Sequence, residues 1–270
     1  MPELPEVETT RRGIAPHLEG RVVSGVVVRD PRLRIPVPET LTRELPGRRI
    51  DSVVRRGKYL LIRAGDATLV VHLGMSGSLR LVKPGTSVRK HDHVDIELGD
   101  QILRYHDPRR FGVVDWRPGD GSDHPLVAPL GVEPLSDEFD GEWLHAATRG
   151  RRSAIKLVLM DSHTLVGVGN IYASESLFRA GIRPTTPAGR LSAARCQRLA
   201  EAVKATLSDA IRAGGSTLRD FVGSHGEPGY FQLEAFVYGR AGEPCRTCGS
   251  PIRQRVLAQR ATYWCAHCQT

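Results

Sequence analysis

Near its amino end, the chain first shows hydrophobic residues at helical spacing and then in short alternating runs. Between Val7 and Leu18 the apolar positions share one side of a helix, and Gly20 follows them. Pro16 weakens the second half of this segment, so we expect the helix to stop a few residues early. The pattern therefore predicts one amphipathic helix ahead of a strand-rich region.

The strand-rich region has the rhythm of a β-sandwich or barrel, with Gly, Pro and Asp between its runs. The predicted strands cover Val22–Val28, Ile50–Val54, Tyr59–Ile62, Thr68–Leu73, Val94–Leu98 and Ile102–Tyr105. Nothing between them is long enough for a series of crossover helices, which favours a mostly antiparallel sheet over an α/β fold. Residues 117–134 are rich in Pro, Gly and Asp and indicate a domain junction.

After the junction, apolar residues return to helical spacing. The predicted helices cover Asp140–Thr148, Ala154–Met160, Tyr172–Ala180, Ala193–Ala213 and a short Leu218–Val222 stretch. The glycine-rich segment 214–231 is expected to be a loop, and its pattern suits a simple connector as well as a functional loop.

Charge and cysteine usage narrow the class of protein. The chain carries 38 Lys and Arg against 30 Asp and Glu, a formal charge of +8, which favours a polyanionic partner such as nucleic acid. No run of apolar residues is long enough for a membrane span, and no secretory leader is evident. Four of the five cysteines form two Cys-x-x-Cys pairs, namely Cys245, Cys248, Cys265 and Cys268. This spacing is typical of one structural Zn²⁺, and it disfavours disulfides in a protein of cytosolic composition.

The first residues are candidates for chemistry. If Met1 is removed, Pro2 carries a secondary amine that is partly neutral at pH 7, and such an amine can form a Schiff base. Glu3 places a carboxyl group beside it for proton transfer. The alternative is that Pro5 and the nearby acids only open a helix.

Three loops of this half carry polar side chains that a core would exclude. Lys58 should lie in a tight turn between two strands, where a solvated basic hairpin is the alternative. Met75 lies in a Gly-rich loop. Its flexible side chain could fill a gap in the hydrophobic core or a gap within a bound ligand. Arg109 next to Phe111 suits insertion into a base stack, although Phe111 buried in the core is equally compatible with the sequence.

Other candidates give weaker signals. The His91/His93 pair lacks a third ligand, so no metal is expected there. Arg151 belongs to a basic turn that suits phosphates or plain solvation. Asn170 precedes a predicted helix as its N-cap, a position that is compatible with a phosphate contact.

Several separated motifs together resemble bacterial formamidopyrimidine-DNA glycosylases. The motifs are Pro2-Glu3-Leu4-Pro5-Glu6, Arg56-Gly57-Lys58-Tyr59, His72-Leu73-Gly74-Met75-Ser76-Gly77, Asp107-Pro108-Arg109-Arg110-Phe111-Gly112 and Leu165-Val166-Gly167-Val168-Gly169-Asn170-Ile171-Tyr172-Ala173. The resemblance implies a bifunctional DNA glycosylase and AP lyase of base excision repair. Such an enzyme excises 8-oxoguanine and formamidopyrimidines from duplex DNA and cleaves the strand by β,δ-elimination.

The resemblance also implies roles for individual residues. Pro2 would be the Schiff-base nucleophile and Glu3 the proton donor that helps to open the sugar ring. Lys58 would assist the strand-cleaving eliminations, and Arg260 would reach the phosphate and the active site. Met75, Arg109 and Phe111 would fill the gap left by the flipped nucleotide. The implied DNA contacts at the backbone are His91, Arg151, Lys156 and Asn170.

The implied fold is α+β and is divided into four parts. These are an antiparallel β-sandwich with a flanking helix (1–118), a linker (119–135), a helical domain with a helix-two-turn-helix and a lesion-capping loop (136–234), and a four-cysteine zinc finger (235–270). The expected protein is a cytoplasmic, nucleoid-associated bacterial monomer that binds damaged double-stranded DNA and no membrane. Two rivals remain: an endonuclease VIII-like enzyme for oxidised pyrimidines, which Leu4 and the Arg109–Phe111 motif disfavour, and a non-catalytic zinc protein that binds DNA.

Overall fold

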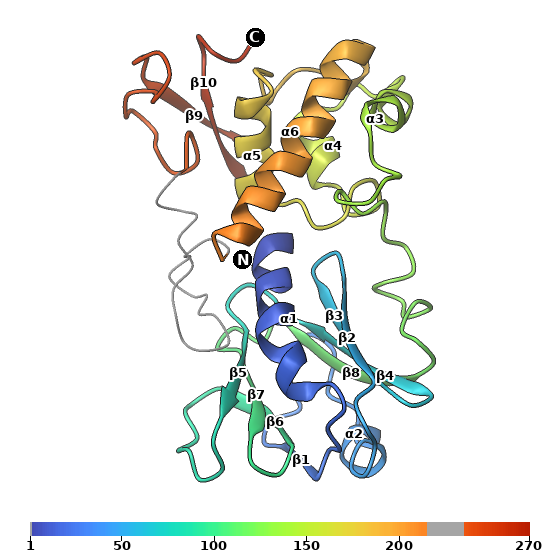
Figure 1. Ribbon diagram of the computed structural model, residues 1–270. Coiled ribbons are helices and arrows are strands. Elements are labelled where there is room, and N and C mark those ends of the chain that lie inside the picture. The colour runs from blue at the N-terminus through green and yellow to red at the C-terminus, as the bar shows by residue number, and fades with distance from the viewer. Residues whose placement is uncertain (1, 215–234) are drawn as a thin grey trace. The chain divides into compact units, whose positions relative to one another are not determined.

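The computed structural model describes residues 2–214 and 235–270, which divide into two compact units (Figure 1). The first unit is built from residues 2–129 and 213–214, and the second from residues 130–212 and 235–270. The predicted short helix at Leu218–Val222 and nearly all of the predicted loop at 214–231 lie outside the described residues.

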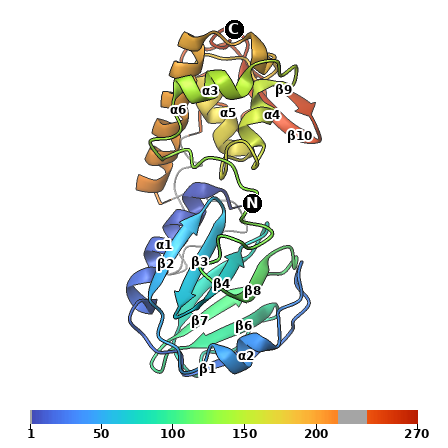
Figure 2. The same ribbon diagram turned by 90° about the vertical axis from the view of Figure 1, so that its right-hand side faces the viewer.

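The first unit contains two four-stranded sheets whose neighbouring strands are all antiparallel (Figure 2). One sheet has the order β1-β6-β7-β5, with strands Gly25–Val28, Asp92–Glu97, Ile102–His106 and Ser78–Val82. The other has the order β2-β3-β4-β8, with strands Ser52–Arg56, Tyr59–Ala64, Ala67–His72 and Val113–Pro118. A short helix, α2 (Thr40–Glu44), lies between β1 and β2 in the chain.

One apolar core joins these sheets to helix α1 (Leu4–Leu18). Leu60 and Leu103, from different sheets, are 0% and 1% exposed, and Leu18 of α1 is 0% exposed. Full burial of such a side chain contributes about 1.5–3 kcal/mol, so packing of this kind outweighs local propensity. Helix α1 contacts β2 and β3 of one sheet and β5 of the other. The predicted antiparallel β-sandwich with a flanking helix is confirmed.

Some details of the prediction were wrong. Helix α1 continues through Pro16 to Leu18, because Ile14 and Leu18 are buried in the core and their packing compensates for the missing hydrogen bond. Strands β5 and β8 and helix α2 were not predicted, and β8 extends to Pro118 inside the segment read as a junction.

The second unit combines helices with a two-stranded ribbon. Its elements are α3 (Gly141–Thr148), α4 (Ile155–Met160), α5 (Asn170–Arg179), the 3-10 helix η1 (Ala188–Arg190), α6 (Ala193–Arg212), β9 (Ile252–Leu257) and β10 (Arg260–Cys265). Helix α6 packs against α3 and α5, and α5 also contacts β10. The helical second half is therefore as expected, whereas the four-part division at residues 118, 135 and 234 stays a prediction.

Two buried polar side chains attach the ribbon region to the helices. The carboxylate of Glu175 on α5 accepts hydrogen bonds from three consecutive backbone N–H groups, those of Phe236, Val237 and Tyr238, at 2.8–3.0 Å. Near the end of the chain, Nε2 of Gln269 donates to the carbonyl of Ile182 at 2.8 Å. No helix among the described residues has the length and apolar character needed to cross a membrane.

Candidate active site

The start of α1 fixes the position of Glu3. Glu3 is the N-cap residue, and its backbone N–H donates to Oε2 of Glu6 at 2.8 Å in a capping box. The side chains are shielded from bulk solvent, since Glu3 is 2% exposed and Glu6 is 0% exposed, and Pro2 beside them is also buried. The carboxyl group expected next to the amine of Pro2 is thus held at the end of a rigid helix.

Lys58 lies in the tight turn between β2 and β3, as predicted. Gly57 of this turn has a φ of 57°, a left-handed conformation that glycine adopts without strain. Its carbonyl accepts a hydrogen bond from Nη1 of Arg55 at 3.0 Å, and Nε of Arg55 lies 3.3 Å from Oε2 of Glu8 on α1. The turn that carries Lys58 is therefore connected to the helix that carries Glu3.

His72, at the end of β4, lies in the electrostatic field of Lys58. Its ring is 4.7 Å from the ring of Tyr59. Burial, together with the positive charges of Lys58 and Arg34, lowers the pKa of His72 to about 4. The imidazole is therefore neutral at pH 7. The sequence motif contains His72, but nothing in the motif assigned it a role.

Met75 and Phe111 face a common cavity of about 330 Å³, which is also lined by Arg34, His72 and Gly74. Phe111 is 47% exposed, so the alternative in which its ring is buried in the core is wrong. The sequence did not single out Arg34, since its Arg-Leu-Arg surroundings contain no motif. The cavity is therefore lined both by Met75 and Phe111, which the sequence indicated as site residues, and by Arg34, which it did not.

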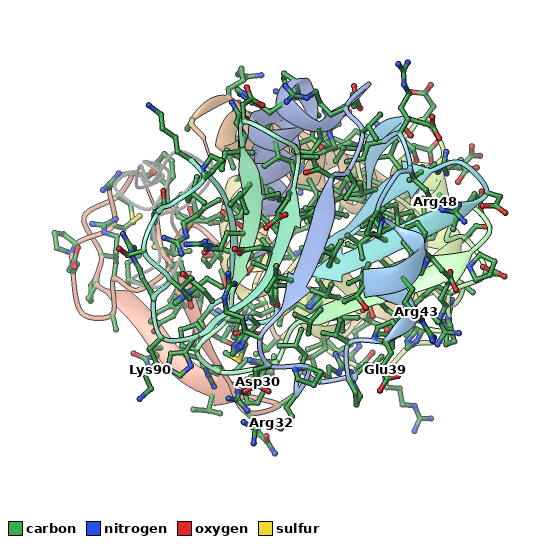
Figure 3. The ribbon with its side chains drawn as sticks, turned by 90° about the horizontal axis from the view of Figure 1, so that it is seen from below. Asp30, Arg32, Glu39, Arg43, Arg48 and Lys90 are labelled. Atoms are coloured by element: carbon green, nitrogen blue, oxygen red, sulfur yellow. The ribbon has the colours of Figure 1, made fainter. Side chains whose placement is uncertain are left out.

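Arg109 is exposed, and its guanidinium lies over the ring of Phe111 at 4.9 Å from the centroid. The next residue, Arg110, bonds to Asp30 through Nη2. Asp30 also accepts two bonds from the guanidinium and one from the backbone N–H of Arg32, its neighbour in Figure 3. These hydrogen bonds lower the pKa of Asp30. The turn that presents Arg109 and Phe111 is thus anchored to the loop after β1.

His91 directly precedes β6 and has a φ of 74°. Its ring lies 6.0 Å from that of His93 and 6.2 Å from that of His106. Desolvation, together with the charges of Lys90 and other neighbours, lowers the pKa of His91. The partly exposed ring therefore lies in a positively charged surrounding that suits a phosphate.

In the second unit, the prediction for Asn170 requires correction. The N-cap of α5 is Gly169, and Asn170 is the first helical residue. The side-chain Nδ2 of Asn170 donates instead to the carbonyl of Ala261 in β10 at 3.0 Å. Lys156 reaches the same strand: its Nζ donates to Oγ1 of Thr262 at 2.7 Å and to the carbonyl of Ala261 at 3.1 Å. Lys156 is 0% exposed, which the basic character of its neighbourhood did not indicate.

Arg260 is exposed at the start of β10, next to the turn of the ribbon. Ala258 and Gln259 form this turn with φ values of 45° and 60°. Arg151 is partly exposed and donates to Oγ1 of Thr164 at 3.1 Å. The ribbon turn and the basic turn thus leave two arginines accessible to a ligand.

The candidate residues divide between the two units. The first unit contains Pro2, Glu3, Lys58, Met75, His91, Arg109 and Phe111, and the second contains Arg151, Lys156, Asn170, Arg260 and the four cysteines of the Cys-x-x-Cys pairs.

Three family models match successive parts of the chain. The formamidopyrimidine-DNA glycosylase N-terminal domain matches residues 1–114, the H2TH domain of the same enzyme matches 130–222, and a zinc finger found in FPG and IleRS matches 242–270. The formamidopyrimidine-DNA glycosylase of Cupriavidus pinatubonensis is 57% identical over 283 residues, with both chains fully covered. The chain belongs to the formamidopyrimidine-DNA glycosylase family.

Other relatives agree with this family. The formamidopyrimidine-DNA glycosylase of Bordetella pertussis is 59% identical, covering 100% of this chain and 99% of its own. A crystal structure of the MutM (Fpg) protein of Thermus thermophilus is similar at 42% identity, with a TM-score of 0.88 and 99% and 98% coverage. The Lactococcus lactis Fpg in complex with DNA containing an abasic site matches at 34% identity, with a TM-score of 0.92 and 99% coverage of each chain. The resemblance drawn from the sequence is confirmed, and so is the expected class of enzyme, a DNA glycosylase of base excision repair.

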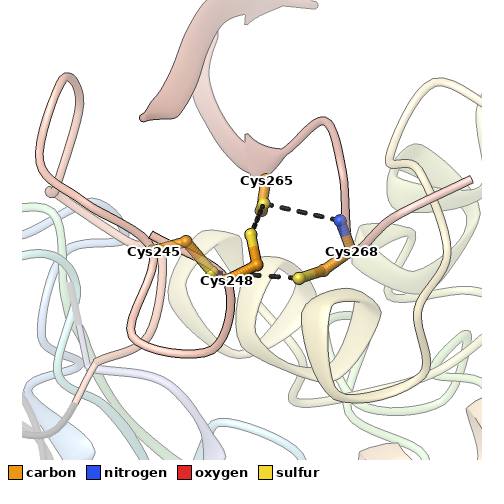
Figure 4. A group of neighbouring side chains, drawn as sticks. All are labelled: Cys245, Cys248, Cys265 and Cys268. Atoms are coloured by element: carbon orange, nitrogen blue, oxygen red, sulfur yellow. Dashed lines mark hydrogen bonds between the residues drawn. The ribbon is translucent and has the colours of Figure 1, made fainter. Parts of the chain in front are cut away.

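The four cysteines of the Cys-x-x-Cys pairs come together as a glycosylase zinc finger (Figure 4). Their Sγ atoms all lie within 4.8 Å of one another, with Cys245 and Cys268 at 3.9 Å and Cys248 and Cys265 at 3.4 Å. Four thiolates at about 2.3 Å from a tetrahedral Zn²⁺ lie roughly 3.8 Å apart, so this geometry fits the ion. The expected cofactor, one structural Zn²⁺, is confirmed by the finger's family model and this cluster.

Proposed function

We propose that this protein excises 8-oxoguanine and formamidopyrimidines from duplex DNA and then cleaves the strand at the resulting abasic site. The observation that carries the proposal is the start of α1, where Pro2 precedes a Glu3 that the helix cap holds in place. Its support is a family relationship that extends over the full chain.

Pro2 acts as the nucleophile after removal of Met1. Its neutral amine attacks C1′ of the damaged nucleotide, so that an N–C1′ bond forms while the bond from C1′ to the base breaks. Glu3 donates a proton to the sugar-ring oxygen and assists ring opening, and the product is a Schiff base between Pro2 and the opened sugar. Burial of Glu3 excludes water from this proton transfer.

Strand cleavage follows from the same Schiff base. Loss of a proton from C2′ expels the 3′ phosphate, and loss of the proton from C4′ then expels the 5′ phosphate. Lys58 and Arg260 assist these steps as cations close to the leaving phosphates. The firmly hydrogen-bonded turn around Lys58 and the exposed position of Arg260 support these roles.

Base removal requires the nucleotide to leave the stack, because its C1′ and base are inaccessible inside a duplex. Met75, Arg109 and Phe111 fill the gap that remains. The support is that Met75 and Phe111 face one cavity, while the Arg109 guanidinium extends over the Phe111 ring. An exposed aromatic ring next to a guanidinium suits insertion between bases.

Contacts to the DNA backbone come from His91, Arg151 and Asn170. His91 and Arg151 are partly exposed, which leaves polar atoms available to phosphates. Lys156 acts together with these residues, and its buried ammonium bonds to the ribbon strand β10. Zn²⁺, when bound by the four thiolates, supplies folding energy to the finger that presents Arg260.

The protein acts as a monomer on damaged double-stranded DNA, in the cytoplasm and in association with the nucleoid. The monomeric state is supported by the sequence, because one chain contains the nucleophile, the gap-filling residues and the zinc finger. The net charge of +8 favours association with the DNA polyanion.

Borohydride trapping tests the proposal. Duplexes with 8-oxoguanine or with thymine glycol are incubated with the protein and borohydride, and the covalent adduct is mapped by peptide analysis. The expected result is an adduct on Pro2 that forms faster with 8-oxoguanine. An adduct only on a lysine would reject Pro2 as the nucleophile. Faster trapping with thymine glycol would instead indicate the endonuclease VIII-like specificity.

A further inference from the structure

The loop containing Met75 and the turn containing Arg109 pack backbone against backbone. We call residues 73–77 the Met75 loop and residues 107–112 the Arg109 turn. A Cβ added to Gly74 would lie 2.6 Å from the nitrogen of Gly112 and 2.7 Å from the carbonyl carbon of Phe111. Side chains do not tolerate such distances, so Gly74 permits a direct contact between the two segments.

Tyr105 fills the space behind this contact. It lies on β7, and each of the two segments connects the two sheets: the Met75 loop joins β4 to β5, and the Arg109 turn joins β7 to β8. Its hydroxyl is 3.2 Å from the carbonyl oxygen of His72 and 3.3 Å from Oδ2 of Asp107, and the residue is 2% exposed. A Cβ on Gly112 would lie 1.7 Å from this hydroxyl. A Cβ on Gly77, in the Met75 loop, would lie 3.2 Å from the same hydroxyl. The phenol therefore lies against both segments, and its contact with His72 at the end of β4 links the two sheets.

Asp107 provides the second connection. Its buried carboxylate accepts hydrogen bonds from the N–H of Gly112 at 2.9 Å and of Arg109 at 3.2 Å, both in its own turn. The hydroxyl of Ser76, in the Met75 loop, lies 3.5 Å from the same carboxylate. A buried carboxylate is stable only when its oxygens are satisfied, so these donors and the carboxylate hold one another in place.

The Asp107 backbone extends the connection to His91. The N–H of Asp107 donates to the carbonyl of His91 at 3.0 Å. The carbonyl of Asp107 lies 2.8 Å from Nε2 of His93. The Arg109 turn is thus fixed to the proposed phosphate contact as well as to the Met75 loop.

We propose that Tyr105 and Asp107 are positioning residues that join the Met75 loop and the Arg109 turn into one rigid body. Met75, Arg109 and Phe111 then enter the base stack together. This inference rests on the proposed function, because it requires those three side chains to fill the gap. Unstacking DNA is costly, and side chains ordered in advance lose less conformational entropy on insertion than independently moving loops would.

Tyr105→Phe is the informative variant, because it removes only the hydroxyl and keeps the ring in the core. Thr68→Val is the matched control, since Oγ1 of buried Thr68 donates to the carbonyl of Gly119 at 2.7 Å, and neither residue belongs to the two segments. Each variant removes one buried hydroxyl donor, so both should lower Tm by about 2–4 °C. Only Tyr105→Phe should slow excision of 8-oxoguanine from duplex DNA, by roughly 10-fold in kcat with little change in KM.

Two further measurements isolate the positioning role. Cleavage of a single-stranded abasic oligonucleotide needs no gap filling, so its rate should be unchanged by Tyr105→Phe. Met75→Ala and Phe111→Ala, made singly and together, should have strongly non-additive effects on duplex excision when Tyr105 is present. Their effects should become additive when Tyr105→Phe is also introduced, because the two segments then move separately.

The outcomes separate this inference from the proposed function. If Met75→Ala and Phe111→Ala both leave duplex excision unchanged, the proposed gap filling is wrong. If these variants slow excision but Tyr105→Phe behaves like Thr68→Val, the positioning role is overturned while the proposed function stands. Equal slowing of the single-stranded reaction by Tyr105→Phe would also overturn it, since that result would reflect general damage to the site.

Discussion

The Oε2 atom of Glu6 accepts a hydrogen bond from the backbone N–H of Glu3 at 2.8 Å, and both residues are buried at the start of α1. The helix terminus and the proposed proton donor therefore depend on the same contact. A change at Glu6 should affect stability and excision together, although Glu6 itself has no proposed role in the chemistry.

Glu6→Ala should lower the free energy of unfolding by about 1–2 kcal/mol, because the cap loses its acceptor. It should also slow excision, because Glu3 is no longer held. Glu6→Gln keeps an acceptor oxygen at the same place and should remain closer to the unmodified protein in both respects. Urea denaturation and single-turnover excision measure the two effects. Full activity in Glu6→Ala would show that the cap does not position Glu3.

The nucleophile can be tested by blocking its nitrogen. Retention of Met1, or an extension of the amino end, should abolish both base removal and the borohydride-trapped adduct, because Pro2 then has no free amine. Glu3→Gln keeps the amine and the approximate shape but cannot donate the proton, so excision should fall by about 10²-fold or more. Gel assays of 8-oxoguanine duplexes measure both variants. An active extended protein would exclude Pro2 from the reaction.

Phe111→Ala and Arg109→Ala should slow excision from duplex DNA more than they weaken non-specific binding, since phosphate contacts come from other residues. Arg43→Ala is a suitable control, because Arg43 is an exposed arginine on α2 of the same unit (Figure 3). Excision rates and salt-dependent binding would be measured for all three variants. If Arg43→Ala and Arg109→Ala have equal effects, charge alone explains the contribution of Arg109.

Zinc content should be one ion per purified chain. Cys248→Ser should remove the metal and weaken DNA binding, because the finger loses a thiolate ligand, while the first unit stays folded. Cys196→Ser provides the comparison, since Cys196 lies on α6 away from the cluster and should keep the full metal content. Elemental analysis and circular dichroism test these outcomes. A finding of two ions per chain, or of none, contradicts the assignment.

Stability should depend on the protonation of His72. Its pKa is lowered to about 4 from an ordinary value of 6.5, so below pH 6.5 the unfolded chain binds a proton that the folded protein excludes. Stability contributed by the neutral imidazole is therefore lost as pH falls from about 6.5 to 4, by roughly 1–3 kcal/mol. Urea unfolding at several pH values should give a flatter profile for His72→Gln. Parallel profiles for the two proteins would refute this contribution.

Features that are specified by a local pattern of residues could be predicted from the sequence. The turn around Lys58 and the cysteine cluster depend on residues close in sequence or on a spacing with few meanings, and both were found as expected. Strand β5 was missed because it follows directly on the glycine-rich Met75 loop, and β8 because its charged end resembles a linker. Such strands are specified by their partners: β8 pairs with β4, more than forty residues away in the chain.

The remaining errors involve polar contacts between distant segments. Asn170 was expected to cap its own helix, but its amide bonds to Ala261, 91 residues later. Lys156 was expected at an exposed surface, yet Thr262 and Ala261 receive its ammonium inside the protein. The local sequence indicates which kinds of hydrogen-bond partner a side chain can have. The tertiary fold determines which of these partners lies close to it.

The Glu175 carboxylate has a consequence for the exchange of amide hydrogens with solvent. The N–H groups of Phe236, Val237 and Tyr238 share this one acceptor, so all three become available for exchange when the chain entering the finger leaves α5. Their deuterium uptake should then proceed at a common rate, distinct from that of the amides inside the ribbon. These three amides can therefore report on detachment of the finger independently of loss of its metal.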